Sequence, residues 1–361
     1  MEKISREDAF ILWLISLNVN DPWRILSYYG TAEAAFRAGF GKGTPECIRK
    51  VVSQTQHHLQ SGMTFLSYKN AKYPARLSVA PHKPLGIFVI GDLPRDDVPS
   101  VAIVGARDNT HYGGRVAYNL AKELAAMGIV IVSGMARGLD ARAHEGALSV
   151  KGKTAAVLAG GADVCYPSEN FQLYTCIKEQ GCVISERLPG TKAEKWAFPA
   201  RNRIISAMAD VLVVVEAAER SGTSHTANHA LDQGKEVFAV PGRVTDVLSV
   251  GTNMLIKQGA FVFTSHYDVL FALTQMRHLQ EFFAKAQQPL SLDKPNEVLP
   301  QKLSLASDEA LVYACISHKA VNADYLAYKT GLKIAKLNTI LLSMELSGQV
   351  KRLPGGSYIK S

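Results

Sequence analysis

The stretch from Ser100 to Gly114, SVAIVGARDNTHYGG, has the composition of a turn that binds an anion. The apolar run at 100–104 predicts a strand, the glycines allow a tight turn, and a helix is expected through Met127. Such a unit presents backbone N–H groups at the start of its helix, where the helix dipole favours negative charge. The stretch lacks the glycine spacing of dinucleotide-binding and P-loop motifs and carries Arg107 instead. The chemistry that these residues predict is the binding of a phosphate group.

Three further turns of this kind follow along the chain. They are Ser133-Gly134, Phe198-Pro-Ala-Arg201-Asn-Arg203 and Ser221-Gly222-Thr223. Arginines at a helix start oppose the helix dipole, so a neighbouring phosphate explains Arg201 and Arg203 better than helix stability does. In the alternative interpretation they form ion pairs with Glu186, Glu194 or Glu216.

These turns can converge only if a parallel sheet ends its strands at one edge. Short runs rich in Val, Ile and Ala predict strands at 87–90, 101–104, 129–132, 155–158, 183–185, 211–215, 237–240 and 261–263. Amphipathic segments of helix length separate them, which is typical of a sheet covered on both faces. The predicted fold class is α/β, with an extended, doubly wound, Rossmann-like and mostly parallel sheet, and its ligands are expected at the carboxyl ends of the strands.

The chain is predicted to have additional modules on both sides of this sheet. Residues 1–64 read as short helices and 65–283 as the Rossmann-like core. Residues 284–304, rich in Gln, Pro, Ser and Lys, read as a linker. Residues 305–361 predict helices near 308–317, 322–329 and 334–348 and then a strand pair turning at Pro-Gly-Gly, which is the pattern of a winged helix.

Composition restricts the class of protein without deciding it. Forty Lys and Arg against 32 Asp and Glu give a net charge of +8, which is compatible with nucleic-acid partners. No segment approaches the ~20 consecutive apolar residues of a membrane span, and the N-terminus does not have the pattern of a signal peptide. A cytoplasmic protein without a membrane partner is therefore expected.

No metal, cofactor or catalytic residue is expected. The five cysteines form no C-x-x-C pair and are interpreted as reduced structural thiols. His225 and His229 stand one helical turn apart but lack the Glu of a zinc motif, so a polar helix face is the preferred interpretation. Asp140 and His144 are interpreted as a helix cap and a packed side chain rather than as an acid/base pair.

An ordered series of motifs carries a resemblance to a known family. The series is VGARDNTHYG, SGMARGLDARAHEGAL, GGADVCYPSEN, VISE, FPARNRII, VVVEAAERSGTSHTANHALDQGKEVFAVPGR and GTNMLIKQGA. It resembles the DNA-processing protein A (DprA, also called Smf) family over about residues 65–270, beginning with Tyr73-Pro74. The resemblance implies a Rossmann core, preceded by a sterile-alpha-motif-like or helix-hairpin-helix module and followed by a winged helix. It also implies a non-enzymatic protein that binds and protects single-stranded DNA and helps load the RecA recombinase in natural transformation.

The same resemblance assigns DNA contacts to residues of this chain. Backbone phosphates are expected near Gly105, Arg107, Ser133, Gly134, Lys195, Arg201, Arg203, Gly222 and Thr223. Phe198 is expected to stack on a base, with Trp196 close by. The chain departs from the family at Ser224 and His225, where apolar residues are more usual.

Two other functions stay open at this point. Lysine-decarboxylase-like nucleoside-monophosphate phosphoribohydrolases share this Rossmann variant, but their P-G-G-x-G-T-x-x-E motif is replaced here by Ser-Gly-Thr-Ser-His-Thr, and no Glu follows Thr223 before Glu236. A transcription regulator would use the winged helix, which can contact either duplex DNA or a protein.

Self-association is also predicted. The segment from Gly251 to Leu273 ends the sheet with a very apolar strand and helix. An open sheet edge there would favour pairing with a second copy of the chain. A homodimer through Leu255 and Leu270 is the expectation.

Overall fold

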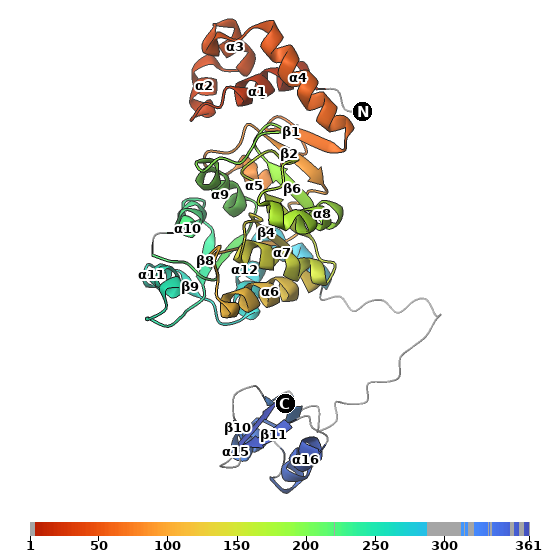
Figure 1. Ribbon diagram of the computed structural model, residues 1–361, viewed down its shortest axis with the longest axis vertical. Coiled ribbons are helices and arrows are strands. Elements are labelled where there is room, and N and C mark those ends of the chain that lie inside the picture. The colour runs from red at the N-terminus through yellow and green to blue at the C-terminus, as the bar shows by residue number, and fades with distance from the viewer. Residues whose placement is uncertain are drawn as a thin grey trace, which may run out of the picture. The chain divides into compact units, whose positions relative to one another are not determined.

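The chain folds as two units, Met1–Gln288 and Pro289–Ser361. The structure is a computed structural model that describes residues 4–219, 221–286, 312–313, 315–316, 321–330, 332, 334–346, 350–353 and 357–360. The predicted linker at 284–304 lies outside these residues from 287 onward. The first unit contains the sheet together with the helices that precede it (Figure 1).

Short capped helices form the N-terminal module. They are α1 (Arg6–Ser16), α2 (Pro22–Tyr29), α3 (Ala32–Arg37), the 3-10 turn η1 (Phe40–Lys42) and α4 (Pro45–Gln60). Ser5, Asp21, Thr31 and Thr44 each accept a hydrogen bond from the backbone N–H three residues later, so local sequence fixes where the four α-helices start. This module packs beside the first two strands of the sheet (Figure 1).

One nine-stranded sheet forms the centre of the first unit. Its strands are β1 (Met63–Ser67), β2 (Gly86–Gly91), β3 (Ser100–Val104), β4 (Val130–Ser133), β5 (Thr154–Val157), β6 (Cys182–Ser185), β7 (Val211–Val214), β8 (Glu236–Ala239) and β9 (Phe261–Val262). Their order is β1-β2-β6-β5-β4-β3-β7-β8-β9. The strands from β6 to β9 are parallel, whereas β1 and β2 are antiparallel additions. The chain winds outward from β3 in one direction and from β7 in the other, so the topological switch point lies between these two strands.

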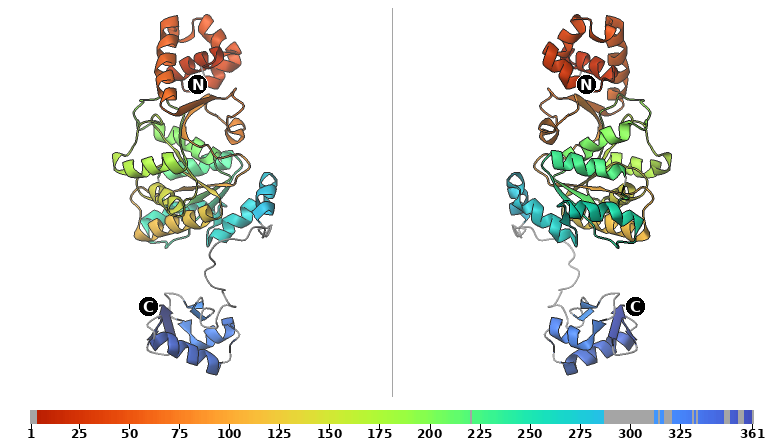
Figure 2. Two further views of the ribbon diagram at one scale, coloured as in Figure 1. Left: turned by 90° about the vertical axis from the view of Figure 1, so that its right-hand side faces the viewer. Right: turned by 90° about the vertical axis from the view of Figure 1, so that its left-hand side faces the viewer.

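Helices cover both faces of the sheet (Figure 2). They are α5 (Ala75–Ser78), α6 (His111–Ala126), α7 (Leu139–Ser149), η2 (Ser168–Asn170), α8 (Phe171–Gln180), α9 (Ala197–Ala207), α10 (Gly222–Asp232), η3 (Val247–Ser249), α11 (Val250–Lys257), α12 (His266–Gln275), η4 (Arg277–Leu279) and α13 (Gln280–Ala286). On β3, Val101 and Ile103 pack with α6, α7 and α12, whereas Ala102 and Val104 pack with α9, α10 and α11. This alternation along a buried strand is the period of two that a covered sheet requires.

The predicted Rossmann-like fold is confirmed, and each of the eight predicted strands is present. One strand escaped prediction. Residues 63–67 form β1, because Met63, Phe65 and Leu66 pack against distant segments of the chain. Five residues directly after a long helix give too short a pattern for periodicity to separate a strand from a loop.

The second unit has the elements of a winged helix. They are β10 (Val321–Asn322), α15 (Ala323–Thr330), α16 (Ile334–Leu346), β11 (Val350–Leu353) and β12 (Ser357–Lys360). The last two strands form the predicted antiparallel hairpin, and β12 also pairs with β10. Of the predicted helix at 308–317, residues 312, 313 and 315 are helical, and most of the rest lies outside the described residues.

His144 lies on α7, and its side chain is buried in the core, as the sequence predicted. The Thr154 hydroxyl donates to the Ile131 carbonyl, so it accepts a hydrogen bond from His144 Nδ1 over 2.7 Å. Complete burial lowers the pKa of His144 to about 3, so the ring is neutral at physiological pH. Its role is packing, and it is not paired with Asp140.

No helix in the described parts of the chain has the length and apolar character needed to cross a membrane.

Candidate nucleic-acid interface

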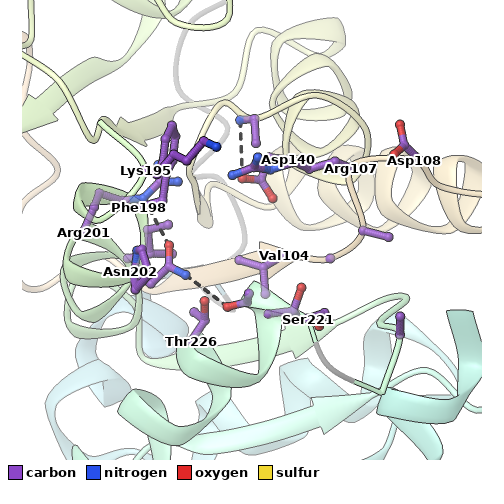
Figure 3. Close-up of a pocket in the computed structure, with 18 of the residues that line it drawn as sticks. Val104, Arg107, Asp108, Asp140, Lys195, Phe198, Arg201, Asn202, Ser221 and Thr226 are labelled. Atoms are coloured by element: carbon purple, nitrogen blue, oxygen red, sulfur yellow. Dashed lines mark hydrogen bonds between the residues drawn. The ribbon is translucent and has the colours of Figure 1, made fainter. Parts of the chain in front are cut away.

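A pocket of about 640 Å³ lies at the carboxyl ends of β3 and β7, beside the topological switch point (Figure 3). We call it the edge pocket. Its walls come from the turns after β3 and β4, the first turns of α9, and the start of α10. Ligands of doubly wound sheets bind at this place because the loops from the two halves of the sheet diverge there and leave a crevice.

The turn after β3 supplies one of the exposed cations of the pocket. A Cβ at Gly105 would lie 2.9 Å from the backbone oxygen of Glu216 as well as 2.3 Å from the Leu139 side chain, so a side chain there would push the turn away from the segment after β7. Arg107 is exposed beyond that turn, and its guanidinium carbon lies 4.9 Å from the centre of the Phe198 ring. Figure 3 shows Arg107 extending across the pocket toward Lys195. This geometry places a positive charge over an aromatic ring at the mouth of the pocket.

The N-terminus of α6 already binds the carboxylate of Glu216. Glu216, 5% exposed, accepts hydrogen bonds from the backbone N–H of Thr110 over 2.9 Å and from the Thr110 hydroxyl. A Cβ at Gly113 would lie 2.3 Å from the carboxyl carbon of Glu216. The dipole of α6 therefore stabilises this carboxylate. A phosphate group in the pocket must instead bind at the exposed side chains above it.

The turn after β4 builds the floor of the site. Ser133 is fully buried and its hydroxyl donates to the Ile103 carbonyl over 2.6 Å. Gly134 leaves room for the Arg201 guanidinium, which a Cβ there would meet at 2.4 Å. Asp140 is also buried, and burial raises the pKa of its carboxyl even though the charge of Arg201 lowers it. Ser133 thus lies beneath the surface that a ligand would touch, whereas Gly134, although buried, lines the smaller hollow that adjoins the edge pocket.

The two arginines of the Phe-Pro-Ala-Arg-Asn-Arg motif point to different sides of α9. Arg201 is 5% exposed, and its Nη1 donates to the carbonyls of Gly134, over 2.7 Å, and of Val157. Burial lowers the pKa of Arg201 to about 10, so the guanidinium keeps its charge at neutral pH. Arg203 lies outside the edge pocket and forms an ion pair with Glu186, which is the alternative that the sequence left open.

Lys195 and Phe198 stand at the entrance of the pocket, at the start of α9. Lys195 is exposed and Phe198 is half-buried. The Phe198 ring lies 5.6 Å from the ring of Tyr166, which is itself 50% exposed. Two rings and two exposed cations, Arg107 and Lys195, therefore share one rim. Aromatic faces beside cations are the groups on which bases stack while phosphates are neutralised.

The start of α10 forms the opposite wall. Nothing lies within 4 Å of a Cβ built on Gly222, so the backbone there is open to a ligand. The Asn202 side chain donates to the Gly222 carbonyl over 3.2 Å and links α9 to α10. Thr223 is 8% exposed, and the buried Oγ of Ser221 has no hydrogen-bond partner among the described residues.

A second, smaller hollow of about 330 Å³ adjoins the edge pocket. We call it the side pocket. Both are lined by Arg107, Tyr166, Phe198 and Arg201, and the side pocket adds Arg137 and Cys165. Together the two hollows form a surface longer than one phosphate group requires.

The structure brings most of the predicted contact residues together. The edge pocket is lined by Gly105, Arg107, Lys195, Phe198, Arg201, Gly222 and Thr223. Asn202 and Ser221 also line the pocket; the sequence named them as members of anion-binding turns but not as contact residues, and it missed Tyr166. Tyr166 lies in the motif GGADVCYPSEN, which gave a signal for the turn after β5 but none for the direction of its ring. Within the described residues no group of three His, Cys, Asp or Glu side chains is placed to hold a metal ion.

Comparison with known proteins agrees with this architecture. Residues 64–274 match the family described as DNA recombination-mediator protein A, and residues 296–356 match the DprA winged helix domain. The chain is 32% identical over 365 residues to Protein Smf of Escherichia coli (strain K12), a match that covers 99% of this chain and 88% of that protein. It is 39% identical over 217 residues to DNA processing protein DprA of Bacillus subtilis (strain 168), covering 60% of this chain and 73% of that protein.

Two solved structures share the fold. The X-ray structure of DNA processing protein A from Streptococcus pneumoniae superposes with a TM-score of 0.61 at 33% identity, covering 75% of this chain and 98% of that one. DNA processing protein A from Helicobacter pylori, whose structure describes the single-stranded DNA binding mode of that protein, gives a TM-score of 0.53 at 30% identity, covering 59% of this chain and 96% of that one. With the family match spanning more than half of its length, this chain belongs to the DNA recombination-mediator protein A (DprA/Smf) family.

Proposed function

We propose that this protein binds single-stranded DNA in the edge pocket with little regard for sequence. The observation that carries the proposal is the rim of the pocket, where Arg107 lies over Phe198 and beside Lys195 at the switch point of the sheet. The Helicobacter pylori relative is described by its single-stranded DNA binding, which supports the same ligand here. Exposed cations attract phosphates of any sequence, and ring faces accept any base.

The residues of the site have three roles in this proposal. Arg107 and Lys195 neutralise phosphates, Phe198 and Tyr166 stack on bases, and the open backbone at Gly222 receives the strand. Gly105, Ser133, Gly134 and Thr223 shape the turns that hold these groups. Arg201 acts from beneath the floor, where its retained charge makes the potential of the pocket more positive.

A recombination mediator uses such a site to hold strands until a recombinase takes them. We infer that this chain protects incoming single strands in the cytoplasm and helps load RecA on them during natural transformation. Support comes from its family, whose members act as recombination mediators. Nuclease protection of the bound strand and faster RecA filament formation on it are the corresponding assays.

The phosphoribohydrolase alternative receives no support from the geometry. Such an enzyme needs a carboxylate exposed to its nucleotide. Glu219 is the acidic residue nearest in sequence to the turn at Gly222, but it does not line the edge pocket, and the other candidate is Glu216, just after β7. Its oxygens are bonded to Thr110, and the carboxylate lies against Gly113, outside the lining of the edge pocket.

The proposal predicts a preference for single strands over duplexes. Fluorescence anisotropy with an oligo-dT should give a Kd at least about tenfold lower than a blunt duplex of equal length, because a duplex hides the base faces that Phe198 and Tyr166 contact. A mixed-sequence single strand should bind within about threefold of oligo-dT, since stacking tolerates any base. Equal or tighter binding of the duplex would contradict the proposal.

We also propose that the protein forms a homodimer at the open end of the sheet. Within the described parts of the chain β9 pairs with β8 alone, and exposed apolar side chains occur on α11, β9 and α12, namely Met254, Phe261, Val262, Tyr267 and Phe271. Of the two predicted interface residues, Leu270 is half-buried, whereas Leu255 is 8% exposed and packs in the core of its own chain. A charge at Leu255 would therefore disturb the fold as well as any interface.

If the protein is a dimer, a charge in place of an exposed apolar side chain at the interface should halve the mass of the species in solution. Phe271, 69% exposed, can be replaced by aspartate with little cost to the folded monomer. Analytical ultracentrifugation at micromolar concentration should show a dimer for the native chain and a monomer for Phe271→Asp, and an unchanged far-UV circular dichroism spectrum should show that this monomer is folded. A native chain that sediments as a monomer would refute the dimer.

A further inference from the structure

A separate hollow of about 380 Å³ lies between the N-terminal helical module and the sheet domain, within the first unit. We call it the module hollow. Trp23 of α2 lines one side, and Lys83, Arg187, Trp196 and Arg203 line the others. None of these residues lines the edge pocket, so the module hollow is a distinct site.

Cations stacked on indole rings distinguish this hollow. The Arg187 guanidinium carbon lies 4.5 Å from the centre of the Trp196 ring, and Lys83 Nζ lies 5.0 Å from the centre of the Trp23 ring. Trp196 is 48% exposed, so part of its ring surface is open to a ligand. The lining repeats the chemistry of the edge pocket, where Arg107 stacks on Phe198.

Arg203 adds hydrogen-bonding capacity that the protein leaves unused. One of its nitrogens, Nη2, contacts Glu186, whereas Nη1 is buried and has no hydrogen-bond partner among the described residues. A buried guanidinium N–H without an acceptor costs free energy unless a ligand supplies one. The lining carries three cations, Lys83, Arg187 and Arg203, against the two carboxylates of Asp21 and Glu186. An anionic ligand would supply the missing acceptor and match the surplus positive charge.

The helix α9 connects the module hollow to the edge pocket. Its first turns present Phe198 and Arg201 to the edge pocket, and Ala200 and Arg203 to the module hollow. Lys195 lines the edge pocket while its neighbour Trp196 lines the module hollow. A chain that leaves the edge pocket over the start of α9 therefore has only one helix, about 10 Å wide, to cross.

We propose that the module hollow is a second subsite for the same single strand, which binds one base against Trp196 and an adjacent phosphate at Arg187 and Arg203. This inference depends on the proposed function, because the strand must first occupy the edge pocket. It gives the helical module a part in DNA binding, since the hollow exists only where that module meets the sheet domain.

The test is a length series of fluorescent oligo-dT, from about 4 to about 16 nucleotides, titrated by anisotropy. Short strands fill the edge pocket alone, and longer strands also reach the module hollow. Trp196→Ala and Arg187→Ala should leave the affinity for the shortest bound strand unchanged and weaken the longer ones by about fivefold to about 100-fold, the range that loss of one stacked base gives. Arg107→Ala should weaken every length.

Arg37→Ala is the matched control. Arg37 is an arginine of the helical module, but it lies at the end of α3, pairs with Glu33 at the surface, and lines neither the edge pocket nor the module hollow. The length dependence of this variant should equal that of the native chain, because it removes one surface charge and leaves both hollows intact.

The outcomes separate this inference from the proposed function. If the native chain binds no length of oligo-dT, the proposed function fails. If the native chain binds but Trp196→Ala and Arg187→Ala behave like it at every length, the module hollow is not a subsite. Loss at all lengths alike overturns the inference too, because it means that both residues act through the edge pocket.

Discussion

Replacing Arg201 by alanine should lower the free energy of unfolding by about 3 to 5 kcal/mol. The guanidinium is 5% exposed and donates to the carbonyls of Gly134 and Val157. A hydrogen bond from a charged group contributes roughly 1.5–3 kcal/mol, and its loss leaves a buried carbonyl without a donor. Thermal denaturation followed by circular dichroism should show a fall in Tm on the order of 10 °C.

Arg142→Ala is the matched control for this experiment. Arg142 is also an arginine at the start of a helix, but its side chain is 46% exposed and pairs with Glu145 at the surface. Surface pairs contribute about 0–1 kcal/mol, so the Tm of this variant should stay near the native value. An unchanged Tm for Arg201→Ala would show that Arg201 does not hold the floor of the edge pocket.

Replacing Arg107 by alanine should weaken single-strand binding by about tenfold or more at physiological salt and leave Tm nearly unchanged. Arg107 is exposed, contacts the Phe198 ring, and forms no ion pair with the described residues. One lost phosphate contact should reduce the magnitude of the slope of log affinity against log salt by about 0.7. Anisotropy titrations at several salt concentrations measure both quantities.

For the native chain, the slope of log affinity against log salt measures how many cationic side chains contact phosphates. It should approach about −3 if Arg107, Lys195, Arg201 and Arg203 each neutralise a phosphate, and about −1.4 if only Arg107 and Lys195 do so. Arg142→Ala again serves as the control, because Arg142 lies over the Tyr118 ring, 5.5 Å from its centre, yet lines neither the edge pocket nor the side pocket. A slope that Arg107→Ala leaves unaltered would contradict the phosphate contact.

Much of the fold could be predicted from local sequence. The eight runs of Val, Ile and Ala became strands because buried parallel strands require apolar side chains on both faces. The ends of the first helices followed from capping residues such as Ser5 and Thr44. β1 escaped because its side chains pack with distant segments, and a five-residue pattern does not distinguish that from a loop.

The sequence by itself also determined the edge at which the site lies and most of the residues that line it. Glycines, a ring and cations at the ends of neighbouring strands must meet once those strands form one parallel sheet. The sequence did not determine which partner each polar side chain contacts or whether that side chain is buried. Glu216 was one of three candidate partners for the arginines, and only the tertiary structure put it at the start of α6, against Thr110.

Arg201 and Arg203 show why that decision needed the tertiary structure. Two residues apart in a helix, they differ in direction by about 200°, so they reach opposite sides of α9. Arg201 became buried because the carbonyls of Gly134 and Val157, 67 and 44 residues away in the sequence, converge on its guanidinium. Arg203 met Glu186 and a hollow partly built by the helical module. Local patterns specify which side chains a turn offers, but burial and partners depend on segments that only the folded chain brings together.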